Sequence, residues 1–219
     1  MKILALEFSS RIRSVAAVEI GPGAQPAAVA TVSDVGSRGT RAFQLITTVL
    51  KNAAWERENV DAIAVGLGPG SYHGIRVAIA IAQGWSVGKQ VRLIGVSSAD
   101  ALAAMLALKG QKEPFTVVID AQRGEFYRAD YTVESGVARE VGALRLAKAA
   151  DIQECLKSGR NLFGPDLSGR LPGIREAFPA ATTVGYLAAR LPLETPGASL
   201  EPIYLRETSF VKAPPPRFA

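Results

Sequence analysis

The sequence has little of the chemistry that most metal sites and nucleophilic enzymes require. Its 219 residues include one cysteine, Cys155, and one histidine, His73. A single cysteine excludes an internal disulfide framework and fits a reducing compartment. One histidine and one cysteine are too few for a His-rich zinc centre, and no partner for a Ser-His-Asp triad is indicated near His73. We therefore predict no catalytic residue and no metal-ligand set, which makes a peptidase the least favoured class.

Long apolar runs are also missing. No stretch approaches the roughly 18 residues that a membrane span needs. The opening MKILALEFSS carries Glu7 inside a short apolar run, unlike a signal peptide, so we expect a cytoplasmic protein without membrane contact. The formal charge of +5 and the pI near 9.5 reflect a mild, dispersed basic excess. That excess has two explanations, a solvated surface or a weak attraction to nucleic acid or an acidic partner.

What is present is an alternation of apolar runs and helical patterns. Short apolar runs predict strands over residues 3–8, 14–20, 27–32, 60–65 and 92–96. Apolar residues at helical spacing predict helices over residues 41–54, 71–87 and 98–108. Strands that alternate with helices indicate an α/β fold with a partly parallel sheet.

The pattern restarts after residues 109–112. An apolar run at 115–119 ends in Asp120 and is followed by a returning strand, just as the run at 3–6 ends in Glu7 and returns. This faint repeat, at a spacing of about 113 residues, suggests a duplicated lobe.

The repeat predicts three segments. They are an N-terminal α/β lobe at 1–109, a C-terminal lobe at 110–206 and an extended proline-rich tail at 207–219. In the C-terminal lobe we expect helices around 146–156 and near 183–191.

Four glycines fall within residues 66–74, between a predicted strand and a predicted helix. Their spacing fits neither a Walker A loop, nor a dinucleotide fingerprint, nor a nucleophile elbow. Two explanations remain. Gly68, Gly70 and a Ser71 N-cap would present helix N–H groups to phosphate, with Asp120 and Glu7 facing magnesium across a cleft. Alternatively, the glycines form a tight turn that lets the helix pack closely on the sheet.

The two predicted helices at 41–54 and 71–87 carry more apolar surface than one core needs. The first has apolar residues on two faces, and the second has small residues spaced by four, which let another helix approach closely. Such features usually belong to core packing, but two of them together suggest a subunit interface. The residues we expect at a partner interface are Phe43, Ile46, Leu50, Gly74, Ala78 and Ala82.

Several segments, in order along the chain, resemble the motifs of one known family. They are ILALEFS at 3–9, DAIAVG at 61–66, GPGSYHGIR at 68–76, GVSS at 95–98, DAQRGEFY at 120–127 and PIYLR at 202–206. Each match is moderately specific, and the ordered series is specific. The chain therefore resembles the TsaB (YeaZ) family of the bacterial tRNA threonylcarbamoyladenosine machinery.

The resemblance implies the fold of actin, heat-shock chaperone ATPases and sugar kinases (ASKHA), with two duplicated lobes. It implies a non-catalytic scaffold that binds the related catalytic subunit TsaD through helices of the N-terminal lobe, joined by the ATPase TsaE. The complex transfers a threonylcarbamoyl group to adenosine 37 of tRNAs reading ANN codons. By this resemblance the chain alone requires no cofactor, while the assembled complex allows ATP or ADP and Mg²⁺. Without a TsaD-like partner, we expect the helix surface to pair with itself in a two-fold homodimer.

The chain departs from the family pattern at three positions. Glu7 stands where the family has Asp, Phe8 where it has Thr, and His73 where it has Thr. These departures weigh against nucleotide binding by the first lobe. They favour a glycine loop that derives from a phosphate-binding loop. In this chain the loop would position the helix that contacts the partner. The alternative function is an active ATPase or small-molecule kinase of the same fold, acting through Glu7 and Asp120.

Overall fold

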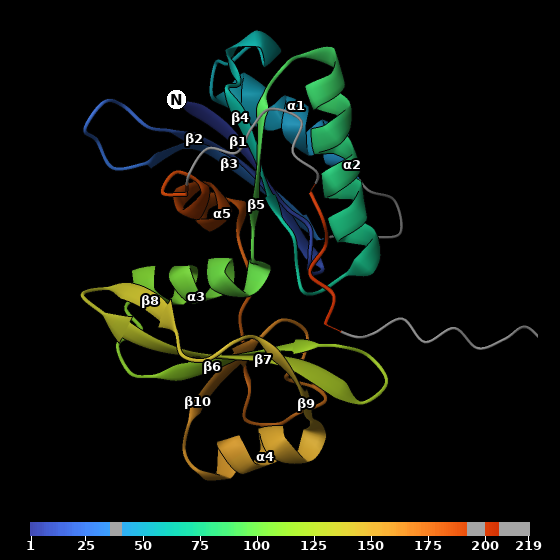
Figure 1. Ribbon diagram of the computed structural model, residues 1–219, viewed down its shortest axis with the longest axis vertical. Helices are drawn as coiled ribbons and strands as arrows, with labels where there is room; N and C mark the ends of the chain where they lie inside the picture. Colours follow the sequence, from blue (N-terminus) through green and yellow to red (C-terminus); the bar gives the residue numbers. More distant parts are fainter. Residues whose placement is uncertain (36–40, 192–199, 206–219) are drawn as a thin grey trace, which may run out of the picture.

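The structure is a computed structural model that describes residues 1–35, 41–191 and 200–205. The tail predicted at 207–219 lies outside the described residues. Within them the chain forms two α/β lobes, which lie one above the other in Figure 1. No helix in these ranges is long and apolar enough to cross a membrane.

Lobe 1, the upper lobe, is built on a five-stranded sheet in the order β3-β2-β1-β4-β5. The first three strands form an antiparallel meander, and β4 and β5 run parallel to β1. The strands are β1 (Lys2–Glu7), β2 (Ile12–Glu19), β3 (Ala27–Val35), β4 (Ala62–Gly66) and β5 (Arg92–Val96). The helices in this part of the chain are α1 (Ala42–Asn52), the 3₁₀ turn η1 (Arg57–Asn59), α2 (Tyr72–Gly88) and α3 (Ser98–Leu108).

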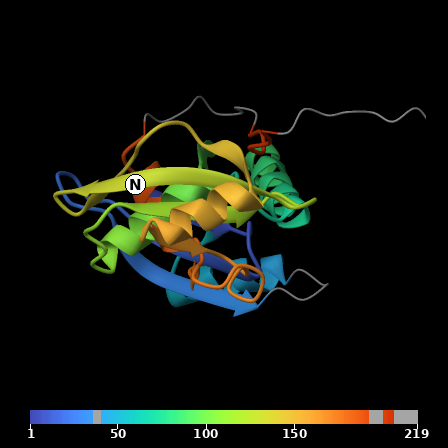
Figure 2. The ribbon, with the colours of Figure 1, turned by 90° about the horizontal axis from the view of Figure 1, so that it is seen from below.

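Lobe 2 is built on a six-stranded sheet in the order β11-β10-β6-β7-β8, with β9 also pairing with β7. Its strands are β6 (Phe115–Asp120), β7 (Glu125–Glu134), β8 (Val137–Glu140), β9 (Arg145–Lys148), β10 (Asn161–Gly164) and β11 (Arg175–Glu176). Its part of the chain contains the helices α4 (Ala149–Lys157) and α5 (Ala181–Ala188). Figure 2 shows α4 lying across the strands of lobe 2 when the molecule is seen from below.

The two sheets repeat one topology. An antiparallel hairpin, β1–β2 or β6–β7, is succeeded by a strand parallel to its first member, β4 or β10, and then by a further parallel strand. The faint repeat in the sequence therefore reflects a true duplication of the sheet. The predicted ASKHA-type α/β fold with two duplicated lobes is confirmed.

Two helices pack against the lobe to which they do not belong in sequence. The boundary predicted at residue 109 therefore separates the two sheets, but it does not separate the helices that cover them. α5 comes after lobe 2 in sequence, yet it packs on the lobe 1 sheet: the Ala181 N–H donates to Ser14 Oγ at 2.9 Å. Gly185 lies so close to β2 that an added Cβ would stand 2.5 Å from Val18 Cγ2. In exchange, α3 places Ala99 and Leu102 against the buried rings of lobe 2.

One predicted helix was partly wrong. Residues 145–148 form β9 rather than the start of the helix predicted over 146–156, because Leu146 pairs with Tyr127 of β7. α4 then begins at Ala149, where the Lys148 N–H donates to the Asp151 carboxylate at 2.8 Å. The edge pairing with a distant strand outweighs the local helical pattern.

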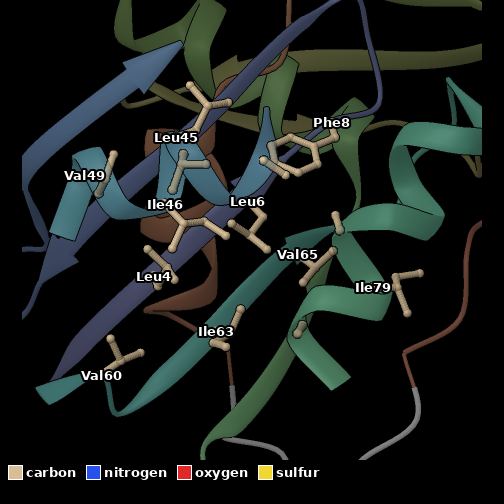
Figure 3. Close-up of a cluster of buried hydrophobic side chains, with 14 of the residues drawn as sticks. Leu4, Leu6, Phe8, Leu45, Ile46, Val49, Val60, Ile63, Val65 and Ile79 are labelled. Atoms are coloured by element: carbon tan, nitrogen blue, oxygen red, sulfur yellow. The ribbon is translucent and has the colours of Figure 1, made fainter. Parts of the chain in front are cut away.

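The main core of lobe 1 lies between the sheet and the helices α1 and α2. Leu4, Leu6 and Ile63 from the strands are fully buried there, and Val49 reaches them from α1 and Ile79 from α2 (Figure 3). Because β1 and β4 are covered on both faces, their residues are apolar in unbroken runs.

Candidate functional site

The glycine loop is held against the end of β1 by close backbone contacts. Ser71 N–H donates to the Ser9 carbonyl at 2.6 Å. A Cβ on Gly70 would stand 2.2 Å from that carbonyl, and a Cβ on Gly74 would stand 2.0 Å from the Phe8 carbonyl. The glycines are therefore required by close packing, which is the second of the two explanations that the sequence leaves open.

Several amide groups of the loop bond within the chain. Gly68 N–H donates to Ser98 Oγ at 3.0 Å, and Leu67 N–H donates to the Val96 carbonyl at 2.8 Å. Ser71 is the N-cap of α2, as predicted, with its Oγ accepting from Gly74 N–H at 3.3 Å. The predicted cofactor residues Gly68, Gly70 and Ser71 thus form a closed turn.

Glu7 is completely buried beneath this turn. Its Oε1 accepts from Ser9 N–H at 2.7 Å, and its Oε2 accepts from Ser98 Oγ at 2.8 Å. A Cβ on Gly66 would stand 2.0 Å from Oε2. Burial raises the pKa of Glu7, against the lowering effect of the hydrogen bonds from Ser9 and Ser98. Both carboxylate oxygens are therefore engaged, Oε1 with the turn after β1 and Oε2 with α3.

Asp120, at the equivalent strand end of lobe 2, is also engaged. It accepts from Gln122 N–H at 2.8 Å and forms an ion pair with Arg170. Among the described residues, no three His, Cys, Asp or Glu side chains gather where they would hold a metal ion. Because Glu7 is enclosed and Asp120 is paired, these residues do not fit a magnesium–nucleotide site as the chain is arranged here.

Charged contacts also join the lobes near this region. Arg11, in the turn between β1 and β2, pairs with Asp166 and, at 3.0 Å, with Glu176 of lobe 2. Its guanidinium lies 4.9 Å from the Phe178 ring. Arg11 therefore fixes the two lobes to each other by side chains.

The predicted partner residues lie in two different environments. Phe43 is 71% exposed on α1. Ile46 is almost wholly buried, although it also borders the groove described below. The other four face the core of lobe 1 and are buried, so the expectation that they present an outward surface is wrong: Leu50, Gly74, Ala78 and Ala82. α1 and α2 each turn a wide apolar face to the sheet. This face takes up the small-residue stripe of α2 and most of the apolar residues of α1, but not Phe43.

The structure instead shows an open groove of about 870 Å³ between the outer sides of α1 and α2. Its walls are mostly apolar, with Phe43 and the edge of Ile46 on the α1 side and Val77, Ile81 and Trp85 on the α2 side. The polar residues His73, Arg57 and Lys89 also contribute to the lining. Such a large apolar groove on the surface of one chain is typical of a site for another protein.

A second small-residue stripe runs along the groove, on the opposite side of α2 from the predicted one. It consists of Ala80, Gly84 and Gly88, all exposed and spaced by four. An added Cβ on Gly84 or Gly88 would meet no described atom within 4 Å, so packing within the chain does not require these glycines. Glycine inside a helix costs about 1 kcal/mol relative to alanine. The stripe therefore suits close approach of a helix from another molecule.

The end of the groove near the last turn of α2 is fixed by contacts within the chain. Lys89 Nζ donates to the Val60 carbonyl at 2.7 Å and to the carbonyl of Glu58. Arg57 lies 5.8 Å from the centre of the Trp85 ring. These contacts tie the end of α2 to η1, so the groove is preformed. Sequence reasoning missed this surface, although the spacing of Ala80, Gly84 and Gly88 was available as a signal.

Comparisons with known proteins agree with the fold. A family model described as TsaD, tRNA N6-adenosine threonylcarbamoyltransferase, matches residues 39–162, which is more than half of the chain. The chain is 34% identical over 91 residues to the tRNA threonylcarbamoyladenosine biosynthesis protein TsaB of Escherichia coli, and 32% identical over 129 residues to that of Haemophilus influenzae. A solved structure of YeaZ from Pseudomonas aeruginosa superposes with a TM-score of 0.73 at 26% identity.

The chain belongs to the TsaB (YeaZ) family. The YeaZ superposition covers 93% of this chain and 99% of that one, so both lobes of the family fold are present. The sequence matches are shorter. They cover 42% and 58% of this chain, but only 39% and 52% of the E. coli and H. influenzae TsaB proteins.

Proposed function

We propose that this chain is a scaffold subunit of the complex that adds a threonylcarbamoyl group to adenosine 37 of tRNAs reading ANN codons. In this role the groove between α1 and α2 binds a TsaD-like catalytic subunit. The observation that carries the proposal is the groove itself, an apolar and preformed surface on lobe 1 that the chain's own described elements leave open. The names of the TsaB relatives supply the modified nucleoside, tRNA threonylcarbamoyladenosine.

The closed glycine loop supports a non-catalytic role. Its Ser71 and Gly68 N–H groups bond to Ser9 and Ser98, and its Ser71 side chain caps α2, which forms one wall of the groove. The loop thus acts through the helix that it positions. Any ATP or ADP and Mg²⁺ belong, in this proposal, to the partner subunits TsaD and TsaE.

The same groove accounts for a homodimer when the partner is absent. Two copies related by a two-fold axis place α1 and α2 of one copy against α1 and α2 of the other, which gives a self-complementary apolar contact. Homodimer and heterodimer then compete for one surface. Contact with tRNA arises through the assembled complex.

The proposal is tested by co-purification of the chain with a TsaD-like protein from the same organism. Phe43→Asp places a charge in the groove, where we expect at least a 30-fold loss of affinity, roughly 2 kcal/mol. Leu108→Asp is the matched control, because Leu108 is 64% exposed at the end of α3 and lies outside the groove. Equal binding by the two variants would contradict the groove as the partner site.

A further inference from the structure

Two exposed tyrosines and an arginine meet beside the first turn of α2. Tyr72 and Tyr204 stack with ring centroids 5.6 Å apart and an interplanar angle of 25°. They are 56% and 43% exposed. The Arg76 guanidinium lies 4.6 Å from the centre of the Tyr72 ring. We call these three residues the tyrosine platform. They are not among the described residues that line the groove.

The platform is held rigidly by the segment 200–205, which runs beside α2 toward the gap between the sheets (Figure 1). Leu200 is buried in the core of lobe 1, and Ile203 N–H donates to the Leu67 carbonyl at 2.9 Å. Tyr204 is therefore anchored to the glycine loop by its own backbone neighbours. A preformed platform loses little conformational entropy when a flat ligand stacks on it.

The platform combines flat aromatic surface with positive charge. Arg76 carries a full charge at the surface, and the first turn of α2, residues 72–75, contains no acidic residue to offset the positive end of the helix dipole. Stacking surface and positive charge are the elements with which proteins hold unpaired nucleotides.

We propose that Tyr72, Arg76 and Tyr204 bind an unpaired nucleotide of RNA, with a base stacked on the tyrosines and the neighbouring phosphate at Arg76. The formal charge of +5 favours RNA over a basic or neutral protein surface of the same size. The inference rests on the proposed role in tRNA modification for the presence of RNA. The groove remains free for the protein partner.

The test measures binding of the full chain to an unmodified tRNA transcript and to a short single-stranded RNA by fluorescence anisotropy. Tyr204→Leu and Tyr72→Leu each remove one ring and are expected to weaken binding by roughly 10-fold or more. Tyr204→Phe keeps the ring and is expected to bind within about 2-fold of the wild type. Wild-type protein that binds neither RNA, or leucine variants that bind as the wild type does, would overturn the proposal.

Charge is tested with a matched pair. Arg76→Gln should weaken RNA binding and reduce the slope of log affinity against log salt by about 1, because one phosphate contact is lost. Arg92→Gln removes the same charge from the start of β5, beyond the opposite end of α2, and should leave that slope unchanged. Identical slopes for the two variants would contradict a phosphate at Arg76.

Heterodimer formation by the same variants separates this proposal from the proposed function. If the leucine variants bind the TsaD-like partner normally but have lost RNA binding, the platform is an RNA site. If they lose the partner but still bind RNA as the wild type does, the platform is a protein contact and the RNA proposal fails. If the wild type binds RNA through the platform but binds no TsaD-like protein, only the proposed function fails.

Discussion

Lobe 1 and lobe 2 share one strand order but differ in the connection that leaves β4 in one lobe and β10 in the other. In lobe 1, β4 leads through the glycine loop into the 17-residue α2 and then to β5. In lobe 2, β10 leads through turns at 165–174 directly to β11, which has two residues. The groove exists only in the lobe that has α2, because α2 is one of its two walls. The duplicated sheets therefore differ in that only lobe 1 has the helix that walls the described groove.

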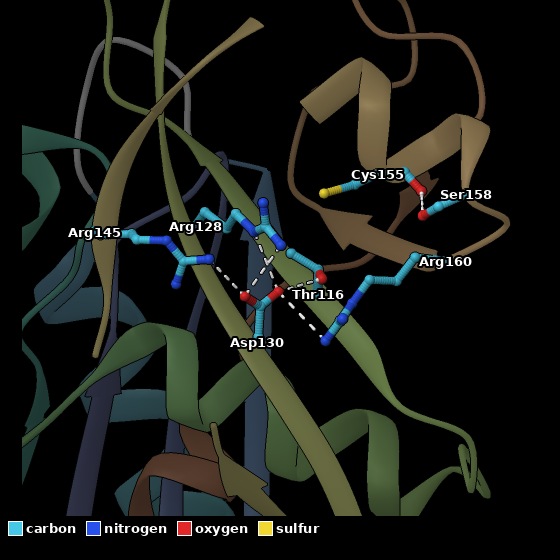
Figure 4. A network of polar contacts seen from close by, with 7 residues as sticks. All are labelled: Thr116, Arg128, Asp130, Arg145, Cys155, Ser158 and Arg160. Atoms are coloured by element: carbon cyan, nitrogen blue, oxygen red, sulfur yellow. Dashed lines mark hydrogen bonds and ion pairs between the residues drawn. The ribbon is translucent and has the colours of Figure 1, made fainter. Parts of the chain in front are cut away.

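The equivalent positions of the two hairpins differ in polarity. Ile3 pairs with Val18 in lobe 1, where both are fully buried, whereas Thr116 pairs with Asp130 in lobe 2. Thr116 Oγ1 donates to Asp130 Oδ1 at 2.6 Å. Asp130 also pairs with three arginines (Figure 4): Arg128, Arg145 and Arg160. Burial alone would raise the pKa of Asp130, but the hydrogen bonds from Thr116 and the arginines lower it.

The largest expected effect is a loss of folding stability that differs between the inner and the outer face of α2. Ala78 is fully buried against the sheet, so Ala78→Arg should lower the free energy of unfolding by more than about 4 kcal/mol and leave little folded protein. Ala80 lies in the groove, so Ala80→Arg should fold normally and lose the TsaD-like partner. Thermal unfolding and size-exclusion chromatography measure the two effects. Normal folding of Ala78→Arg would show that the inward face is misassigned.

The next effect concerns the polar pair of lobe 2. Asp130→Asn leaves three arginines without their carboxylate and should lower the free energy of unfolding by about 2–4 kcal/mol. Glu134→Gln is the matched control, because the ion pair of Glu134 with Arg139 is about two-thirds exposed and should contribute less than about 1 kcal/mol. Chemical denaturation compares the two. Similar losses would mean that the Asp130 network does not stabilise lobe 2 as a buried unit.

A smaller effect depends on pH and belongs to lobe 1. Because the folded-state pKa of Glu7 is raised above its ordinary value of 4.5, its titration favours the folded state fully below pH 4.5. That contribution is lost as the pH rises through the raised pKa. Glu7→Gln does not titrate, so the stability of the variant relative to the wild type should increase with pH from about 4.5 upward. A difference that is constant or falls across that range contradicts the assignment.

The smallest expected change in stability comes from replacing glycine by alanine on the outer face of α2, compared with the same replacement on the inner face. Gly84→Ala should raise the free energy of unfolding by about 0.5–1 kcal/mol, since its Cβ meets open space, and should weaken partner binding. Gly74→Ala places the same methyl group 2.0 Å from the Phe8 carbonyl and should destabilise the chain. Denaturation of both variants measures the direction of the change in the free energy of unfolding, and partner titration measures the direction of the change in affinity. Stronger partner binding by Gly84→Ala would exclude close helix approach at that glycine.

The sequence alone determined the local elements and the duplication. Unbroken apolar runs indicated the central strands because both faces of β1 and β4 are covered. Ser71 marked the start of α2, because an N-cap is a local interaction. The equivalent strand ends at Glu7 and Asp120 marked the two lobes, and the ordered motifs indicated the family.

Only the tertiary structure decided which side of each helix faces outward. Gly74, Ala78 and Ala82 have the same spacing as Ala80, Gly84 and Gly88, and nothing local distinguishes the two stripes. The choice depends on how α2 packs on the sheet through the turn that Ser9 closes. Contacts between distant residues also placed α5 on the sheet of lobe 1, where the Ala181 N–H meets Ser14 across 167 residues. A local pattern carries no information about such a partner, because the contact forms only when distant parts of the chain have folded together.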